Sequence, residues 1–226
     1  MHCFYAPQLT SLGAHSLTED EWRHMKALRV KPGEKIVVVD GLGSYQCFQF
    51  HLNGKQPFIE PLSAIIKEHQ PNGVHLYIPM TQQSDRIEWM LEKSTEMGLR
   101  GLNIITTKYA EKSKFSIDRL ERIAIAAMKQ SQRKWLPYVK VYSTWDSVME
   151  VLKGESVFIA HCEEGDKMIW NPSVESSPHV LIGPEGDFHV SEIQDVLKLG
   201  GVPISLGAAR LRTETAGLLV VSKYYL

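Results

Sequence analysis

The sequence predicts an α/β protein in which a mostly parallel sheet, covered by helices on both faces, follows a small β-rich domain of the barrel type. Two observations lead to this prediction. After residue 73, apolar runs of strand length alternate with segments of helical periodicity, as in parallel sheets with helical crossovers. Before that point the clearest signal is a β-hairpin. We therefore expect one domain at residues 1–70 and another at residues 71–226.

The first domain contains the hairpin pattern. Ile36–Val39 and Tyr45–Phe50 are strand-like runs, and Asp40–Gly43 between them favours a tight turn because glycine accepts a positive φ. A further strand is expected over Phe58–Ile66. Gln70–Gly73 consists of turn formers and is the natural linker to the second domain.

The second domain alternates strands with helices. Strands are expected at Val74–Met80, Asn103–Thr107, Tyr138–Tyr142, Val157–Cys162, Val180–Gly183 and Val202–Leu206. Helices are expected at Ser84–Met97, after Ser116, at Ser191–Leu199 and at Glu214–Tyr225. Alternation of this kind puts helices on both faces of the sheet and ligands at the carboxyl ends of its strands.

The charges of the chain are unevenly distributed. The net charge of the 226 residues is −1, but residues 93–140 hold 11 Lys or Arg and 4 Asp or Glu. A basic face that follows phosphates and a merely solvated helix face are both consistent with this pattern.

The composition also bears on the cellular compartment. Cys3, Cys47 and Cys162 are odd in number and far apart, so they predict no disulfide framework. The N-terminal residues lack the basic-then-apolar pattern of a signal peptide, and no apolar run approaches the length of a membrane span. We expect a cytoplasmic protein.

Two polar loops follow apolar strands near the C-terminus, Ile182–Phe188 and Leu206–Ala216. Strand ends of a parallel sheet meet at one edge, so we expect the two loops to form walls of one ligand site. In the first loop, glycines allow a close approach of the backbone, whose N–H and C=O groups suit a flat polar ring such as adenine. The alternative is a plain strand-to-helix turn.

The second loop carries the charged candidates. Thr213 or a neighbour is expected to cap the last helix, and Glu214 is favoured by the helix dipole. Arg212 is a cation at a helix N-terminus, which is mildly unfavourable, so it needs a partner. Suitable partners are Glu185, Glu214, a phosphate or a ligand carboxylate.

Several standard sites are missing from the sequence. It has no G-x-x-x-x-G-K-[ST] phosphate loop, no G-x-G-x-x-G turn that opens a helix, no H-E-x-x-H pair and no G-x-S-x-G elbow. His161–Glu164 offers metal-ligand residue types, but neighbouring strand residues point to opposite faces. We therefore expect no metal.

The two loops resemble motifs of a known family. Leu181–Phe188 with Glu192 is similar to the GPEGGF-x-x-x-E motif of the RsmE family, and Leu206–Ala216 is similar to its LG-x-R-I-L-R-T-E-T-A motif. His24–Arg29 resembles the family's H-x-x-x-L-R segment, and Gln130–Arg133 resembles its Q-S-x-R segment. The likeness runs along the whole chain in a consistent order.

The resemblance implies a fold and an activity. RsmE proteins are methyltransferases of the SPOUT superfamily that use S-adenosylmethionine and act on a uridine N3 of 16S ribosomal RNA. The expected fold is thus a SPOUT-type parallel sheet with a C-terminal trefoil knot, preceded by a PUA-like β-barrel that binds RNA. A homodimer is also implied, with each cofactor site near the partner subunit and the small ribosomal subunit or its RNA as substrate.

The resemblance also implies roles for individual residues. Arg212, Glu214 and Glu185 are the catalytic candidates, with Arg212 stabilising a developing uracil anion or anchoring a phosphate. The candidates for RNA contact are Arg29, Lys108, Lys129, Arg133 and Arg210. Those for cofactor binding are His161, Ile182, Gly183, Pro184, Glu185, Gly186, Leu206, Gly207, Leu211, Thr213, Thr215 and Ala216.

Four residues depart from the family pattern. Asp187 stands where the family usually has a second glycine, and Ala209 with Arg210 stands where arginine followed by an aliphatic residue is usual. His189 replaces a serine, which weakens the expected capping box. Two other functions remain alternatives: a non-catalytic RNA-binding module for ribosome assembly, and a SPOUT methyltransferase that acts on a ribose 2′-hydroxyl.

Overall fold

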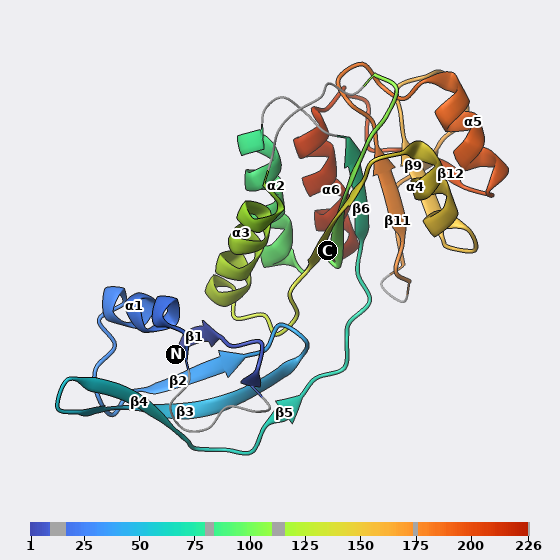
Figure 1. Cartoon of the computed structure of the whole chain (residues 1–226). Helices are drawn as coiled ribbons and strands as arrows, with labels where there is room; N and C mark the ends of the chain where they lie inside the picture. Colours follow the sequence, from blue (N-terminus) through green and yellow to red (C-terminus); the bar gives the residue numbers. More distant parts are fainter. Residues whose placement is uncertain (10–16, 80–83, 110–115, 174–175, 226) are drawn as a thin grey trace. The chain divides into compact units, whose positions relative to one another are not determined.

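A computed structural model describes residues 1–9, 17–79, 84–109, 116–173 and 176–225 (Figure 1). Its contacts divide the chain into two compact units. The first unit is Met1–Pro71 with Ile125–Leu136, and the second is Asn72–Ala124 with Pro137–Leu226. Met80, Lys112 and Lys114, which belong to the predicted strand and the basic stretch, lie outside the described residues.

The first unit is a five-stranded sheet with one helix. Its elements are β1 (His2–Tyr5), α1 (Glu19–Ala27), β2 (Lys35–Val39), β3 (Ser44–Asn53), β4 (Gln56–Pro61) and β5 (Ile66–Lys67). The strand order is β1-β2-β3-β4, and β5 pairs with β3. The predicted hairpin is β2–β3, and the buried Asp40 closes its turn by accepting hydrogen bonds from the Leu42 and Ser44 amides at 2.7 and 2.8 Å.

A buried ion pair joins the C-terminal end of α3 (Ile117–Gln130) to α1 within the first unit. Lys129 Nζ lies 2.6 Å from Glu21 Oε1, and the two side chains are only 12% and 9% exposed. Glu21 Oε2 also accepts a hydrogen bond from the Tyr5 amide. The second half of α3 therefore belongs to the N-terminal unit although it lies far along the chain, which the sequence patterns do not predict.

The second unit is built on a seven-stranded sheet in which every pairing is parallel. The strand order is β10-β12-β9-β11-β6-β7-β8. The strands are β6 (His75–Pro79), β7 (Gly101–Ile105), β8 (Tyr138–Tyr142), β9 (Val157–Ala160), β10 (Met168–Ile169), β11 (His179–Ile182) and β12 (Val202–Ser205). The last strand, β12, is inserted between β9 and β10.

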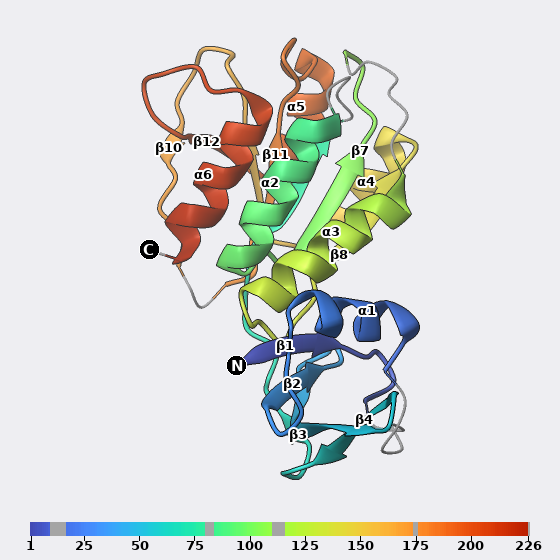
Figure 2. The same ribbon diagram turned by 90° about the vertical axis from the view of Figure 1, so that its left-hand side faces the viewer.

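Helices cover both faces of this sheet. On one face α2 (Ser84–Met97) packs against α6 (Thr213–Tyr225), as Figure 2 shows, while α4 (Trp145–Leu152) and α5 (Val190–Lys198) lie on the other. The predicted parallel α/β fold is confirmed. None of the described helices is long and apolar enough to cross a membrane.

The sequence patterns miss the helices α1 and α4 and the strands β1 and β10, and they misplace two further strands. The strand predicted over Phe58–Ile66 is instead two strands, β4 and β5, separated by residues 62–65. The helices α1 and α4 are short, at 9 and 8 residues, and each begins after a threonine whose hydroxyl caps it, Thr18 and Thr144. Such short segments show too few turns for a clear period. The strand predicted at Asn103–Thr107 is β7, which begins two residues earlier because Gly101 pairs with His75.

Two histidines stack at the amino ends of the strands, at the sheet edge where β6 and β11 begin. The rings of His75 and His179 lie 4.3 Å apart, and each binds a tyrosine hydroxyl through Nδ1, Tyr138 at 2.6 Å and Tyr77 at 2.9 Å. Burial and the neighbouring His179 lower the pKa of His75 to about 3. Burial also lowers the pKa of His179, against the opposing effect of Glu155. Both rings are therefore neutral at pH 7.

Candidate functional site

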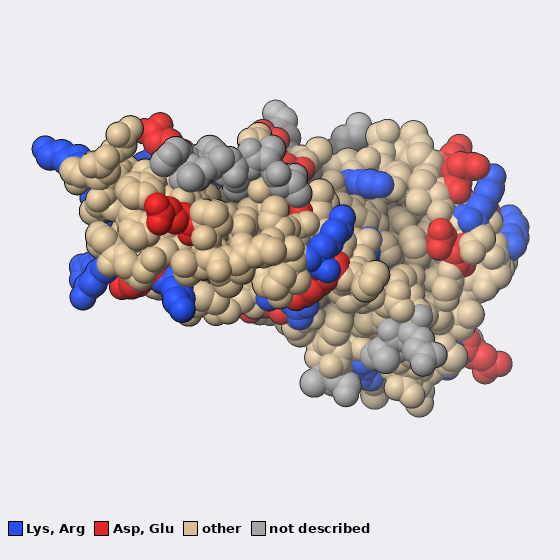
Figure 3. All heavy atoms as spheres, turned by 90° about the horizontal axis from the view of Figure 1, so that it is seen from below, with Lys and Arg blue, Asp and Glu red and all other residues tan. Residues whose placement is uncertain are grey.

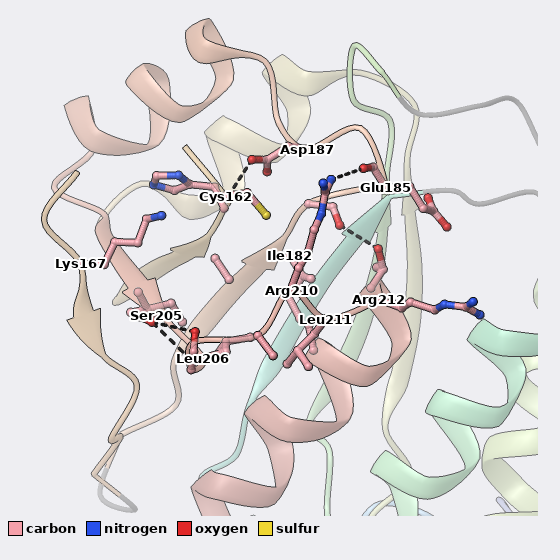
Figure 4. Close-up of a pocket in the computed structure, with 18 of the residues that line it drawn as sticks. Cys162, Lys167, Ile182, Glu185, Asp187, Ser205, Leu206, Arg210, Leu211 and Arg212 are labelled. Atoms are coloured by element: carbon pink, nitrogen blue, oxygen red, sulfur yellow. Dashed lines mark hydrogen bonds between the residues drawn. The ribbon is translucent and has the colours of Figure 1, made fainter. Parts of the chain in front are cut away.

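The pocket that carries the polar loops lies at the carboxyl edge of the sheet. The strands β12, β9 and β11 are parallel neighbours, so the segments that follow them emerge side by side. Together these segments enclose a pocket of about 710 Å³, which is in the range of sites for drug-sized ligands (Figure 4). Both polar loops line this one pocket, as the sequence predicts, and that a ligand binds there stays a prediction.

Most of the predicted cofactor residues line this pocket. They are His161, Ile182, Gly183, Pro184, Glu185, Leu206, Gly207, Leu211, Thr213 and Ala216. Arg210 and Arg212 line it too. Gly186, Glu214 and Thr215 are not among its lining residues. Gly186 and Thr215 are exposed, and Glu214 pairs with Arg86 of α2.

Three hydrogen bonds join the loops of the pocket to one another. The Thr213 hydroxyl donates to the Gly183 carbonyl at 2.8 Å, and Arg210 Nη2 donates to the Glu185 carbonyl at 2.8 Å. The Cys162 amide donates to the Asp187 carboxylate at 2.6 Å. Thr213 is the first residue of α6, and its hydroxyl joins the two loops. That Thr213 or a neighbour caps the helix stays a prediction.

His161 presents a buried polar atom at the pocket. Its Nδ1 is buried, and no described residue hydrogen-bonds to it. Burial, helped by the Lys167 cation, lowers the pKa of His161, so the ring is neutral at pH 7. A neutral ring offers one donor and one acceptor, and an unpaired buried nitrogen is costly unless a ligand binds it. No cluster of three potential metal ligands occurs among the described residues.

The three catalytic candidates do not form one cluster. Arg212 is exposed, and Figure 4 shows its side chain running away from Asp187 towards α2. Glu214 Oε1 lies 3.7 Å from Arg86 Nη1, so the structure pairs this glutamate with Arg86 rather than with Arg212. Glu185 is exposed at the rim, where its carbonyl accepts from Arg210.

The five predicted RNA contacts lie in different environments. Lys129 is buried in its ion pair with Glu21, so it is not available to a phosphate and that prediction is wrong. Arg29 and Lys108 are exposed, Arg133 is half-buried, and Arg210 is engaged at the pocket. Basic and acidic side chains are interspersed on the face drawn in Figure 3, so a phosphate bound there would meet single basic side chains.

Comparison with known proteins covers the whole chain. A family model described as an RNA methyltransferase domain matches residues 68–224, and an RNA methyltransferase PUA domain matches residues 17–62. The chain is 27% identical to ribosomal RNA small subunit methyltransferase E of Aquifex aeolicus over 98% of each protein. It is 24% identical to the Mesomycoplasma hyopneumoniae protein of that name over 92% of each.

This chain belongs to the RsmE family of RNA methyltransferases.

Solved RsmE-like structures share the fold. A probable rRNA methyltransferase from Porphyromonas gingivalis is 32% identical, with a TM-score of 0.87 over 98% of this chain and 96% of that one. A small subunit methyltransferase E from Neisseria gonorrhoeae, solved with S-adenosyl methionine bound, is 25% identical with a TM-score of 0.82 over 98% and 95%. The N-terminal unit is accordingly PUA-like.

Asp187 stands where RsmE proteins usually have a glycine, and it adopts a backbone conformation that favours glycine. Its φ is 65°, in the left-handed region where aspartate is tolerated better than most residues. Its carboxylate accepts from the amides of Cys162 at 2.6 Å and Phe188 at 2.8 Å. A Cβ on Gly183 would lie 2.7 Å from Asp187 Oδ1, so a larger residue at position 183 would displace the Asp187 carboxylate. Aspartate at this position thus adds a hydrogen bond between the loop after β9 and the loop after β11.

His189 retains the capping box despite replacing the usual serine of RsmE proteins. Its Nδ1 accepts from the Ser191 amide at 3.1 Å, and Glu192 Oε2 accepts from the His189 amide at 2.8 Å. The expectation that histidine weakens this cap is wrong, because an imidazole nitrogen accepts a backbone hydrogen bond as a hydroxyl does.

The sequence patterns miss two polar lining residues, Lys167 and Ser205, which lie outside the predicted loops. Lys167 lies in the connection between β9 and β10, and its ammonium donates to the Glu163 carbonyl at 2.5 Å. That connection has no recognisable motif, and the sequence alone gives no sign that it folds back to the pocket.

Proposed function

We propose that this protein transfers a methyl group from S-adenosylmethionine to N3 of a uridine in 16S ribosomal RNA. The observation that supports this most directly is the pocket itself, which is formed by the two RsmE-like segments and closed by hydrogen bonds between them. The Neisseria gonorrhoeae relative was solved with S-adenosyl methionine bound. The family's RNA methyltransferase model covers this part of the chain.

The residues present fit the cofactor. A pocket of about 710 Å³ is large enough for a nucleoside with an amino-acid tail. Apolar side chains such as Ile182 and Leu211, together with exposed loop backbone, suit the adenine ring. His161 Nδ1 supplies a buried polar atom that lacks a partner among the described residues. Asp187, Glu185 and Lys167 add charges of both signs, which suits a zwitterionic ligand.

The reaction sets definite tasks for the protein's own side chains. When bound, the cofactor supplies a methyl group activated by its sulfonium. The proton of uracil N3 must leave, so negative charge develops on the ring and needs a cation. Arg212 provides that cation at the pocket. Of the two carboxylates, Glu214 is held by Arg86, so Glu185 at the exposed rim is the better placed proton acceptor.

The finer features implied by RsmE membership belong to the same proposal. They are a first domain at residues 1–70 that binds RNA, a methyltransferase domain at residues 71–226, a C-terminal trefoil knot, a homodimer and a cytoplasmic location. Insertion of β12 between β9 and β10, with bonds between the loops, supports the knot. Arg29, Lys108 and Arg133 remain the proposed phosphate contacts, and Arg210 supports the pocket wall.

Two measurements test the proposed function. Calorimetry with S-adenosylmethionine should show binding, and mass mapping of small ribosomal subunits after reaction should place one methyl on a uridine base. Absence of cofactor binding would favour a non-catalytic assembly module. A methyl on the ribose 2′-hydroxyl would favour the other SPOUT chemistry.

A further inference from the structure

A small cluster lies beside the pocket, and of its members only Lys108 has a role above, as a proposed phosphate contact. It consists of Lys108 and Tyr109, which follow β7, and His189 at the start of α5. Figure 2 shows that β7 ends and α5 begins at the same edge of the sheet. Tyr109 is 54% exposed, so its ring is accessible to a ligand.

Tyr109 lies next to the loop that carries Glu185 and Asp187, two lining residues of the pocket. A Cβ placed on Gly186 of that loop would be 3.5 Å from the Tyr109 Cβ. The Tyr109 ring also meets the His189 ring edge-on, with centroids 5.6 Å apart. A planar group stacked on Tyr109 would therefore lie next to a ligand in the pocket.

The segment that carries Tyr109 is held in place. The Lys108 amide donates to Glu192 Oε1 at 2.8 Å, and the other oxygen of this buried carboxylate accepts from the His189 amide. One glutamate thus anchors both sides of the cluster, so the backbone segments that carry Lys108, Tyr109 and His189 are fixed relative to each other. Such pre-organisation reduces the entropic cost of binding.

The Lys108 ammonium and the His189 Nε2–H are two hydrogen-bond donors that lie close together. The Ser191 amide donates to His189 Nδ1, which leaves the ring proton on Nε2. Lys108 Nζ lies 3.4 Å from that Nε2, and neither group can accept from the other. An anionic oxygen between them would accept from both, and a phosphate oxygen is such an acceptor.

We propose that Lys108, Tyr109 and His189 form a nucleotide platform at the mouth of the pocket, where Tyr109 stacks a base and the two donors hold its phosphate. The inference rests on the proposed function and adds substrate positioning to it. An aromatic face beside paired donors is the combination that binds single-stranded nucleic acid. The platform would keep the target uridine, or the nucleotide next to it, unpaired beside the cofactor.

The first test is the affinity for a short oligouridine, measured by fluorescence anisotropy with S-adenosylmethionine present. Tyr109→Ala should weaken binding by about 5- to 100-fold, the range expected for loss of one stacked base. Tyr109→Phe keeps the ring and should bind within about twofold of wild type. Val190→Ala, which removes an exposed apolar side chain next to His189, should have no effect.

The second test concerns the donors. Lys108→Ala should reduce the slope of log affinity against log salt by about one contact, while Lys153→Ala, on an exposed lysine after α4, should leave it unchanged. Cofactor affinity by calorimetry should be that of wild type in every variant. This control separates the platform from the pocket.

Definite results would overturn the platform. Wild-type affinity of Tyr109→Ala would do so, as would equal weakening by Tyr109→Phe, which would assign the effect to the hydroxyl. Weaker binding to assembled subunits with unchanged binding to oligouridine would indicate a ribosomal protein as the occupant. If the wild type binds cofactor but no RNA, the platform and the proposed substrate both fail, whereas full methylation by Tyr109→Ala rejects the platform alone.

Discussion

Arg212 and Asp187 are two charged residues of the pocket that differ in whether they bind other parts of the protein. Both line it, but only Asp187 has hydrogen bonds to loop backbone. Arg212 has no ion pair within the described part of the chain. One charge therefore holds the loops together, and the other remains available to a substrate.

The role of Arg212 predicts a kinetic effect without a structural one. Arg212→Ala should lower turnover by about 100-fold, comparable to removal of one donor that stabilises a developing anion. Cofactor affinity and the midpoint of urea unfolding should stay unchanged, because the guanidinium is exposed. Arg212→Lys should restore part of the rate. Wild-type turnover of the alanine variant, measured with radiolabelled methyl donor, would contradict the assignment.

The hydrogen bonds of Asp187 predict that its replacement weakens cofactor binding. Asp187→Gly is compatible with the left-handed backbone but removes both accepted hydrogen bonds, so cofactor affinity should fall by about fivefold or more. Asp187→Asn retains one carbonyl oxygen and should be intermediate. Calorimetry gives the affinities, and faster hydrogen exchange of the Cys162 amide should accompany them. Unchanged exchange in the glycine variant would show that the loops do not depend on this residue.

At the scale of elements, the helix α3 is predicted from the sequence, but its buried ion pair with α1 is not. Its apolar period is evident, and its basic residues are consistent with a phosphate-binding face. In the structure Lys129 instead forms the buried pair with Glu21 of α1. Breaking a buried pair costs more than removing both partners, because one charge is left unpaired.

This difference is measurable. Lys129→Met should lower the free energy of unfolding of the N-terminal unit by about 3 kcal/mol. The double variant with Glu21→Gln should recover more than half of that loss. Lys26→Ala, on an exposed lysine of α1, serves as the matched control and should change little. Equal losses in the single and double variants would mean that packing, not charge, holds this contact.

Local patterns determine how much of these elements the sequence reveals. The helix α2 begins and ends where predicted, because its apolar residues repeat over 14 residues and Gly98 follows it with a φ of 107°. Both pocket loops are recognisable because they place polar residues at the ends of apolar strands. The positions of Lys167 and Tyr109 depend on how connections fold back in space, and no short-range pattern encodes that.

At the scale of the whole molecule, the stacked histidines make stability depend on pH. The pKa of His75, about 3 in the folded protein, lies below its usual value near 6.5. The unfolded chain therefore takes up a proton that the folded protein does not, so stability is lost as the pH falls from about 6.5 towards 3. The positive charges of Arg100 and Lys140 act in the same direction, and Glu155 beside His179 opposes them.

Denaturant unfolding between pH 7 and pH 4, followed by tryptophan fluorescence, tests this prediction. His75→Gln should flatten the loss of stability with falling pH, whereas His69→Gln, on an exposed histidine, should leave the wild-type slope. Identical slopes for wild type and His75→Gln would assign the acid sensitivity to other groups.

The insertion of β12 between β9 and β10 has a consequence for synthesis of the protein. Strand β12, the loop after it and Thr213 are translated after the other strands of the sheet, yet they supply one wall of the pocket and the hydroxyl that joins the walls. A nascent chain still lacking these residues can fold its N-terminal strands but has no complete cavity. The enzyme therefore becomes competent for its ligand only once this late segment has emerged from the ribosome, the same kind of particle whose RNA we propose it modifies.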